Sequence, residues 1–165
     1  EQKARFEDSG SDKTSQQRLY YWEGGYEMMN EYPFTGVGFF NFPQYFEDNY
    51  PDKLLYSGAQ LPHNILVQVG ADLGYPGLIV YVWMILLSFI LTRRSTRSLK
   101  DSSALGPIRE IGLFMNVSFL GFLVAGQFVS VAFYPFMWIH LALVGCFYTV
   151  SKSTRQEEAS VSRDR

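Results

Sequence analysis

The chain has 165 residues, a formal net charge of -2 and a mean hydropathy of -0.04. Acidic residues outnumber basic ones before Leu73, whereas Arg93 to Lys100 and the tail after Ser151 are basic, and this asymmetry indicates membrane topology rather than nucleic-acid binding. The single cysteine, Cys146, excludes a disulfide framework and a cysteine-based metal site. The mean hydropathy averages a polar first part and a second part with long uncharged runs, which is typical of a membrane protein with a large loop. The chain starts at Glu1 without a methionine, and we expect it to be the downstream part of a longer protein.

Residues 1–62 are predicted to form an extracytoplasmic loop that is only partly helical. Glu1 to Ser15 has no apolar periodicity and is expected to have no regular structure. From Thr14 to Glu31, apolar residues recur at helical spacing until a proline follows, which predicts a short amphipathic helix. Its weak point is expected at Gly24 and Gly25, because glycine is a poor helix former.

Arg18 lies in the first turn of this helix, and Trp22 lies one turn later. They are four residues apart, so their side chains can share one face. An arginine stays charged and presents a planar fork of donors that suits phosphate oxygens. The alternative is a surface ion pair of Arg18 with Glu23 or Asp12, which would contribute little to stability.

Tyr32 to Phe42 is predicted to form a tight turn walled by aromatic rings. Pro33 fixes one backbone angle, whereas Gly36 and Gly38 permit angles that other residues resist. No strand pattern precedes these glycines and no Walker lysine follows them, so a nucleotide site is not indicated. The many aromatic residues of the loop fit two roles, packing and anchoring at a membrane interface or stacking on sugar rings.

An acidic cluster follows this turn. It consists of Glu47, Asp48 and Asp52, of which the first two belong to a helical turn expected over Gln44 to Tyr50. Carboxylates and pyrophosphate often share a divalent metal, but this spacing matches no metal-binding loop that we can identify. We therefore expect a solvated acidic loop, with no metal site and no cofactor.

His63 stands where the polar loop gives way to an apolar run. A histidine just ahead of a membrane-entering helix can stay in contact with water while the helix fixes its position. Its ordinary pKa of about 6.5 leaves it largely neutral and basic at neutral pH, so it is the candidate proton acceptor. The alternative is a residue that anchors the loop beside Asn64, itself a good helix N-cap.

Residues 63–92 are predicted to form a loop-exit helix and the first membrane span. Asn64, Gln68 and Asp72 are spaced four apart and form a polar stripe, which we expect to be a wet face. Leu73 to Thr92 carries no charge and, at about 1.5 Å per residue, is long enough to cross a hydrocarbon core of about 30 Å. Pro76 is expected to kink this helix.

The rest of the chain alternates basic and uncharged segments. Residues 93–110 form a basic loop that is expected to face the cytoplasm, and residues 111–150 are long enough for two spans with a turn near Tyr134 and Pro135. Two spans return the basic tail, residues 151–165, to the cytoplasm. The prediction is therefore an all-α, polytopic membrane protein with three spans in this segment. The polar residues within the uncharged run are expected to face other helices, with His140 as a packing residue rather than a proton relay: Asn116, Ser118, Gln127, Ser130 and His140.

Several short motifs occur together in a fixed order. The chain contains Arg18, Trp22, Pro33, Gly36-Val37-Gly38, Asn41-Phe42, His63-Asn64, Leu73-Gly74 and Gly77-Leu78. In order and approximate spacing, this set resembles the C-terminal part of the O-antigen ligase family. That family includes polysaccharide polymerases and protein O-oligosaccharyltransferases, all of them polytopic proteins of the bacterial inner membrane with a large periplasmic loop.

The resemblance implies a fold similar to that of the type C membrane glycosyltransferases. It implies transfer of a saccharide from undecaprenyl pyrophosphate to a hydroxyl of lipid A core, another glycan or a protein, with no nucleotide sugar. On this analogy His63 acts at the acceptor, Arg18 holds pyrophosphate, and Trp22 and Asn64 bind substrate. The second arginine of the family is expected upstream of this segment.

Two other classes of function compete with this interpretation. In a transporter or flippase component whose loop gates a lipid-linked substrate, His140 and Gln127 would matter more than His63. In a membrane-anchored interaction loop without chemistry, His63 and Arg18 would both tolerate substitution. Within the enzyme reading, ligase and polymerase differ only in the acceptor, and these residues do not separate them.

Overall fold

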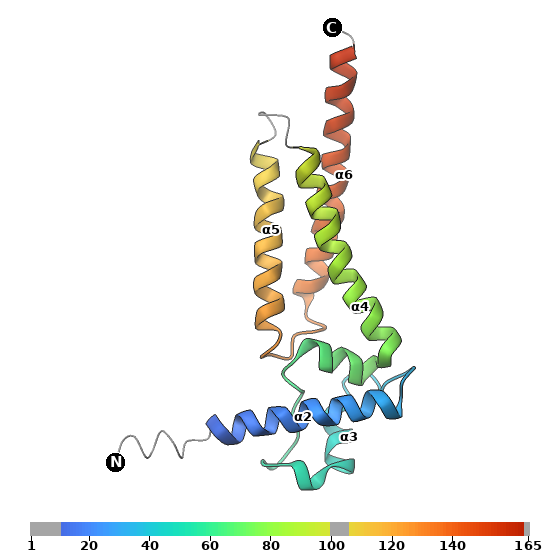
Figure 1. Cartoon of the computed structure of the whole chain (residues 1–165), viewed down its shortest axis with the longest axis vertical. Coiled ribbons are helices and arrows are strands. Elements are labelled where there is room, and N and C mark those ends of the chain that lie inside the picture. The colour runs from blue at the N-terminus through green and yellow to red at the C-terminus, as the bar shows by residue number, and fades with distance from the viewer. Residues whose placement is uncertain (1–10, 100–105, 164–165) are drawn as a thin grey trace, which may run out of the picture. The chain divides into compact units, whose positions relative to one another are not determined.

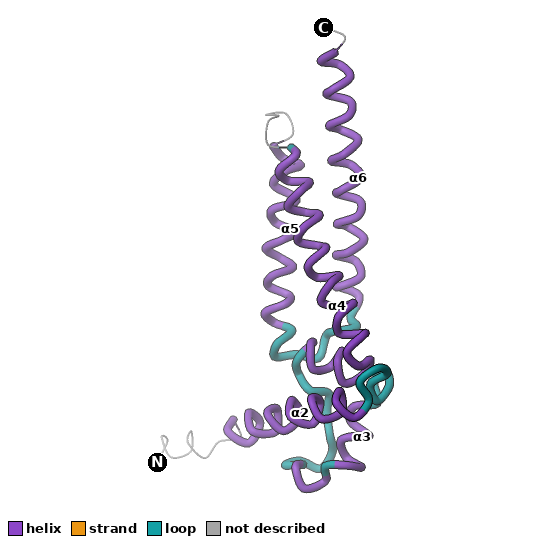
Figure 2. Tube along the Cα trace, turned by 45° about the vertical axis from the view of Figure 1, so that its right-hand side comes forward, coloured by secondary structure: helices purple, strands orange, loops and turns teal. Residues whose placement is uncertain are grey.

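The computed structural model describes residues 11–99 and 106–163, and within them it contains helices and loops but no strand (Figures 1 and 2). The chain divides into two compact units, the first formed by Glu1–Tyr81 and Gly126–Ala132, the second by Val82–Ala125 and Phe133–Arg165. The predicted all-α fold class is confirmed for the described residues. The elements are α2 (Ser11–Glu31), α3 (Phe42–Asn49), the 3-10 helix η1 (Pro51–Lys53), α4 (Ile65–Ser98), α5 (Gly106–Ala125) and α6 (Pro135–Arg163).

Helix α2 begins earlier than the apolar pattern predicted. The prediction that residues up to Ser15 have no regular structure is wrong from Ser11 onward. No glycine or proline follows Gly10 until Gly24, so polar residues with adequate helix propensity extend the helix by one turn without adding to its apolar face. The remainder of that prediction, residues 1–10, lies outside the described part.

Gly24 and Gly25 are sites of close packing rather than a weak point. Both are buried, and a Cβ built on Gly24 would lie 2.6 Å from the Phe46 ring, while one on Gly25 would meet Val67. The absence of side chains lets α2 approach α3 and α4 closely. Tyr21 completes this contact, with its ring edge-on to Phe46 at 4.8 Å between centroids.

The loop aromatics divide into a buried and an exposed set. A core cluster of the first unit is made of Tyr21, Met28, Phe42, Phe46 and Ala71. The rings of this cluster therefore take the packing role that was one of the two expected. Large exposed rings remain on the same unit, namely Tyr26, Phe34, Phe39, Phe40 and Tyr56.

The kink predicted at Pro76 is a break at Gly74, where the backbone is non-helical with φ 69° and ψ -173°. The break removes the intrahelical partners of nearby carbonyls, so Ala71 O accepts the Val37 N–H at 2.8 Å and Asp72 O accepts the Gly38 N–H at 3.1 Å. Pro76 then falls in the first turn of the second half of α4, where a missing N–H costs little. These two bonds attach the turn of residues 32–42 to α4 just before Gly74.

The polar stripe on the first half of α4 is buried, so the expectation of a wet face is wrong. Gln68 and Asp72 are 1% and 0% exposed. Asp72 Oδ2 accepts the N–H of Phe40 at 3.2 Å, which fastens the same turn a second time. The turn thus packs back on α4 at Asp72, a contact that sequence spacing does not reveal.

Substituting Gly36 tests this fastening. Its φ is +63°, and a Cβ would collide with the backbone of Ala71 and Asp72, which cannot move as a side chain can. We expect Gly36→Ala to cost more than about 2 kcal/mol and to lower the thermal unfolding temperature of the purified protein. Gly121→Ala is the matched control, because nothing lies within 4 Å of a Cβ there. Equal unfolding temperatures for the two variants would contradict this account.

Among the described residues, two helices are long and apolar enough to cross a membrane, judged by length and composition. They are α4 and α5. The third expected span falls in α6, which is not one of these two helices, so the count of three spans stays a prediction. The helices also run past their predicted ends, α4 to Ser98 and α6 to Arg163, because Arg, Lys, Gln and Glu are good helix formers.

The connection between α5 and α6 is longer than the tight turn predicted near Tyr134 and Pro135. Helix α5 ends at Ala125, residues 126–134 follow, and α6 begins at Pro135. Gly126 ends the first helix and proline suits the first turn of the next, so both ends carry recognisable signals.

In the second unit, His140 Nε2 lies 2.9 Å from Ser88 Oγ and its ring stacks on Phe119 with 4.0 Å between centroids.

Candidate functional site

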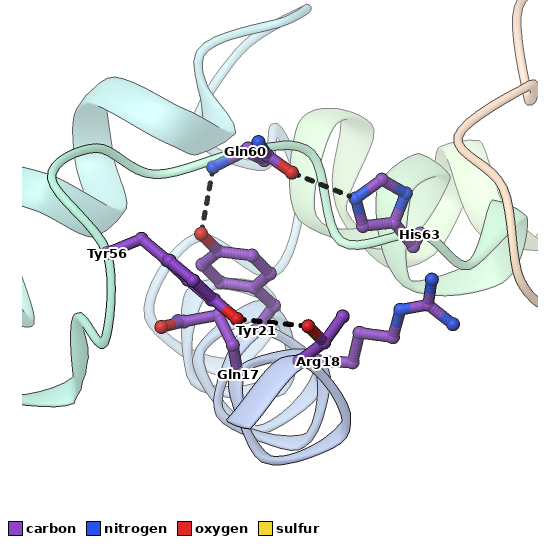
Figure 3. Close-up of a pocket in the computed structure, with 7 residues that line it drawn as sticks. Gln17, Arg18, Tyr21, Tyr56, Gln60 and His63 are labelled. Atoms are coloured by element: carbon purple, nitrogen blue, oxygen red, sulfur yellow. Dashed lines mark hydrogen bonds between the residues drawn. The ribbon is translucent and has the colours of Figure 1, made fainter. Parts of the chain in front are cut away.

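A cavity of about 260 Å³ lies in the first unit between α2 and the loop that leads to α4. Figure 3 shows polar side chains from both elements around it. Helix α2 contributes one face at three- and four-residue spacing, and the loop closes the other side. The lining residues are Thr14, Gln17, Arg18, Tyr21, Tyr56, Gln60 and His63.

Helix α2 binds the backbone of the loop through three side chains, those of Gln17, Tyr21 and Trp22. The amide of Gln17 accepts the Leu55 N–H at 2.6 Å and donates to Lys53 O at 3.2 Å. The Tyr21 hydroxyl accepts the Gln60 N–H at 2.9 Å. Because these bonds are made to backbone groups, they fix the path of the loop and not merely the positions of its side chains.

Trp22 completes this attachment one residue before the candidate base. Its Nε1–H donates to Pro62 O at 2.9 Å. Trp22 thus bonds the residue before His63, while Arg18, four residues earlier on α2, lines the cavity with His63. The contact gives Trp22 a positioning role in the structure, and its binding of substrate stays a prediction.

The backbone of His63 adopts an uncommon conformation, with φ +50°. A positive φ is unfavourable for residues other than glycine, so surrounding contacts must hold it. The His63 N–H donates to Ser130 Oγ at 3.0 Å. Two residues later, the Ile65 N–H donates to Gly126 O at 2.9 Å. The connection between α5 and α6 thus holds the histidine.

The side chain of Asn64 is occupied by structural contacts. Its Oδ1 accepts the N–H groups of Leu66 at 3.0 Å and Val67 at 3.1 Å, which is the N-cap arrangement that its residue type favours. Its Nδ2 donates to Gln127 Oε1 at 3.1 Å. These bonds place Asn64 beneath the site as a cap, while its predicted role in substrate binding remains untested.

Gln127 and Ser130 were expected to face other helices, and that expectation is wrong. Both lie in the connection outside the helices and bind the junction at Asn64 and His63. The reason is that the connection starts at Gly126, well before the turn that the sequence suggested. Sequence spacing carries no signal for this contact across more than sixty residues.

Arg18 and His63 line the same cavity, so the structure brings together the two residues that were predicted separately (Figure 3). The Nε of Arg18 is buried and has no hydrogen-bond partner in the described part of the chain. The alternative pairing with Glu23 does not occur, since Glu23 pairs with Lys53 at 3.3 Å. Within the described part of the chain, Arg18 therefore forms no ion pair that would compete with an anionic ligand.

Two effects lower the pKa of His63 from its ordinary value of 6.5. Burial of the ring is the larger, and the positive charge of Arg18 is the second. The ring Nε2 lies 3.3 Å from Gln60 Oε1. With that oxygen as acceptor, Nε2 carries the proton and Nδ1 is the basic nitrogen. A neutral, basic imidazole is what a proton acceptor requires.

None of the three acidic residues lines this cavity, and one of them, Glu47, bonds the loop. Glu47 Oε1 accepts the Ala59 N–H at 2.6 Å, and Asp48 accepts from the Gln44 amide at 3.1 Å. Among the described residues, no group of three or more His, Cys, Asp or Glu side chains is arranged to hold a metal ion.

Sequence reasoning did not assign five of the lining residues to the site, namely Thr14, Gln17, Tyr21, Tyr56 and Gln60. For two of them a signal existed: Gln17 and Tyr21 are four residues apart on the α2 face that also carries Arg18. Tyr56 and Gln60 lie in an irregular loop, where no periodicity marks the residues that turn inward.

Comparison with known proteins gives one match. Residues 2–82 match the family model described as O-antigen ligase, a range that includes every residue lining the cavity. No curated protein and no solved structure gives a significant match to the chain.

Proposed function

We propose, on the premise that the chain belongs to the O-antigen ligase family through residues 2–82, that it transfers a saccharide from undecaprenyl pyrophosphate to an acceptor hydroxyl. The observation that supports this proposal is the shared cavity of Arg18 and His63, which puts a guanidinium whose Nε has no partner among the described residues beside an imidazole whose pKa is lowered. The protein acts in surface polysaccharide assembly as a multi-pass protein of the bacterial inner membrane, with residues 1–62 in the periplasm.

The reaction assigns a different task to each residue. The acceptor oxygen forms a bond to the anomeric carbon of the saccharide while the bond from that carbon to the pyrophosphate oxygen breaks. His63 takes the acceptor proton, and Arg18 donates hydrogen bonds to the pyrophosphate as its negative charge increases. Lipid pyrophosphate is a good leaving group, so no strong acid is required opposite His63. No step uses a metal or a nucleotide sugar.

The remaining contacts support these two residues. Trp22 fixes the backbone just before His63 from α2, and Ser130 fixes the N–H of His63 from the other side. Positioning of this kind matters because a displacement of about 1 Å at a reacting group can cost about 100-fold in rate. The exposed rings of Phe34, Phe39 and Phe40 offer surfaces on which the sugar chain can stack.

The lowered pKa of His63 predicts how transfer depends on pH. A lowered pKa keeps the ring neutral to a lower pH, so kcat/KM should hold as the pH falls through 6.5 and decline only below it. In Arg18→Gln the positive neighbour is gone, and the residual activity should decline at a pH closer to 6.5. The measurement is kcat/KM across the acid range for both proteins. A decline of kcat/KM that begins above pH 6.5 would contradict the assignment. So would a decline at the same pH in the wild-type protein and in Arg18→Gln.

Analysis of cell-surface polysaccharide from a strain that lacks the protein tests the proposal in cells and identifies the acceptor. Mass spectrometry should find unmodified lipid A core beside intact polymer if the protein is a ligase. It should find single repeat units if the protein is a polymerase, the alternative acceptor chemistry within the family. Unchanged polysaccharide would contradict both forms of the proposal.

A further inference from the structure

The second unit contains another cavity, of about 260 Å³, where the last turns of α4 meet α6. Three of its lining residues are cationic and none is acidic. Arg94, Lys152 and Arg155 form no ion pair within the described part of the chain. The complete lining is Arg94, Ser95, Ser98, Tyr148, Ser151, Lys152 and Arg155.

One buried hydroxyl in this cavity has no partner. Ser95 is 3% exposed, and its Oγ forms no hydrogen bond among the described residues. The other two serine hydroxyls are occupied, since Ser98 Oγ donates to Ser95 O at 2.8 Å and Ser151 Oγ donates to Phe147 O at 2.7 Å. A buried hydroxyl without a partner, in a cavity lined by three cationic side chains, can donate a hydrogen bond to an anionic ligand.

The walls of the cavity are held by packing about one turn away. Gly112 of α5 is buried, and a Cβ there would lie 2.5 Å from Thr96 Oγ1 and 2.6 Å from the Phe147 ring. The glycine thus allows α5 to touch α4 and α6 at one point. Thr96 follows Ser95, and Phe147 lies one turn before Ser151, so this contact keeps the two walls at a fixed spacing.

We propose that this cavity binds the phosphate of an anionic phospholipid headgroup. Arg94, Arg155 and Lys152 supply the positive charge, and Ser95 supplies a neutral donor to a phosphate oxygen. An alternative explanation is that the basic residues only set the orientation of the span in the membrane, as Lys and Arg at span ends do. That explanation does not account for the buried Ser95 hydroxyl without a partner among the described residues.

A lipid fits better than a soluble phosphate because of what borders the cavity. Next to it the helices expose large apolar side chains, Ile90 on α4 and Val150 on α6, at 40% and 50% of their surface. Tyr148 lies in the lining itself, and tyrosine is enriched at the level of lipid headgroups. Acyl chains can therefore cover the apolar surface while the headgroup phosphate occupies the cavity.

Native mass spectrometry of the purified, delipidated protein in detergent tests the proposal. Phosphatidylglycerol should bind with a defined stoichiometry, phosphatidylcholine should bind more weakly, and millimolar inorganic phosphate should not displace the lipid. We expect the triple variant Arg94→Gln, Lys152→Gln, Arg155→Gln to weaken phosphatidylglycerol binding about 100-fold. Displacement by inorganic phosphate would overturn the lipid assignment.

Two further variants separate a built site from diffuse charge. Arg93→Gln, Arg97→Gln, Arg109→Gln removes three charges from an adjacent cavity of about 220 Å³ and should weaken binding no more than about fivefold. Ser95→Ala changes no charge and should weaken it about three- to tenfold. Equal losses for the two triple variants, together with no effect of Ser95→Ala, would overturn the proposal.

Discussion

Replacing His63 with alanine should lower the rate of glycosyl transfer by about 100- to 10,000-fold, the usual contribution of a positioned base. The loss is expected because no other histidine lines the cavity and the acceptor proton would then pass to water. Transfer is measured with purified protein, lipid-linked donor and acceptor, and protein abundance in the membrane is measured alongside. Near-normal product from the variant would remove His63 from the chemistry.

The backbone of His63 calls for a second substitution as a control. Its φ of +50° is unfavourable for alanine, whereas asparagine tolerates this conformation better. His63→Asn should therefore fold as the natural protein does and still lose transfer. Ser57→Ala, at an exposed position in the same loop, should keep full activity. Addition of imidazole should restore part of the rate in His63→Ala, which a purely structural role for His63 would not allow.

The second large effect is expected at Arg18. Arg18→Lys keeps the positive charge but loses the planar fork, so transfer should fall about 10- to 100-fold, the range expected for lost hydrogen bonds to a charged group. The loss should appear in the kinetics for the lipid-linked donor, with the acceptor KM little changed. Lys13→Gln removes a charge from an exposed position on the same helix and should have little effect.

Full activity in Arg18→Lys would contradict paired hydrogen bonds from this side chain to pyrophosphate. A loss confined to the acceptor KM would instead assign Arg18 to the acceptor side of the cavity. In that case Arg18 would belong to the acceptor and not to the pyrophosphate, and the roles assigned to Arg18 and His63 would have to be revised.

The sequence predicted each half of the site but not what joins the halves. His63 stood out at a change of composition and Arg18 on an amphipathic helix, because both signals are local. Their meeting depends on bonds from Gln17, Tyr21 and Trp22 to loop backbone about forty residues away. Side chains that bind irregular backbone leave no periodic pattern, so these contacts required the structure.

The fold shows the same division between local and distant effects. Leu73 to Thr92 was predicted to be a span from its lack of charge, and it lies in α4, which is long and apolar enough to cross a membrane. The break beside Pro76 was indicated by proline and glycine. The burial of Asp72 was not foreseen, because its partner is the N–H of Phe40 in a turn that packs back on the helix. Likewise, Ser130 binds the His63 N–H because the α5–α6 connection is longer than charge patterning indicated.

The most direct test of the central claim is a defined reaction of the purified protein with an undecaprenyl-pyrophosphate-linked glycan and a hydroxyl acceptor, followed by mass spectrometry. The account predicts an acceptor heavier by one transferred glycan, joined through a new glycosidic bond, together with released undecaprenyl pyrophosphate. Wild-type protein that binds the donor or moves it across the membrane without forming that bond would contradict the claim and favour a transporter.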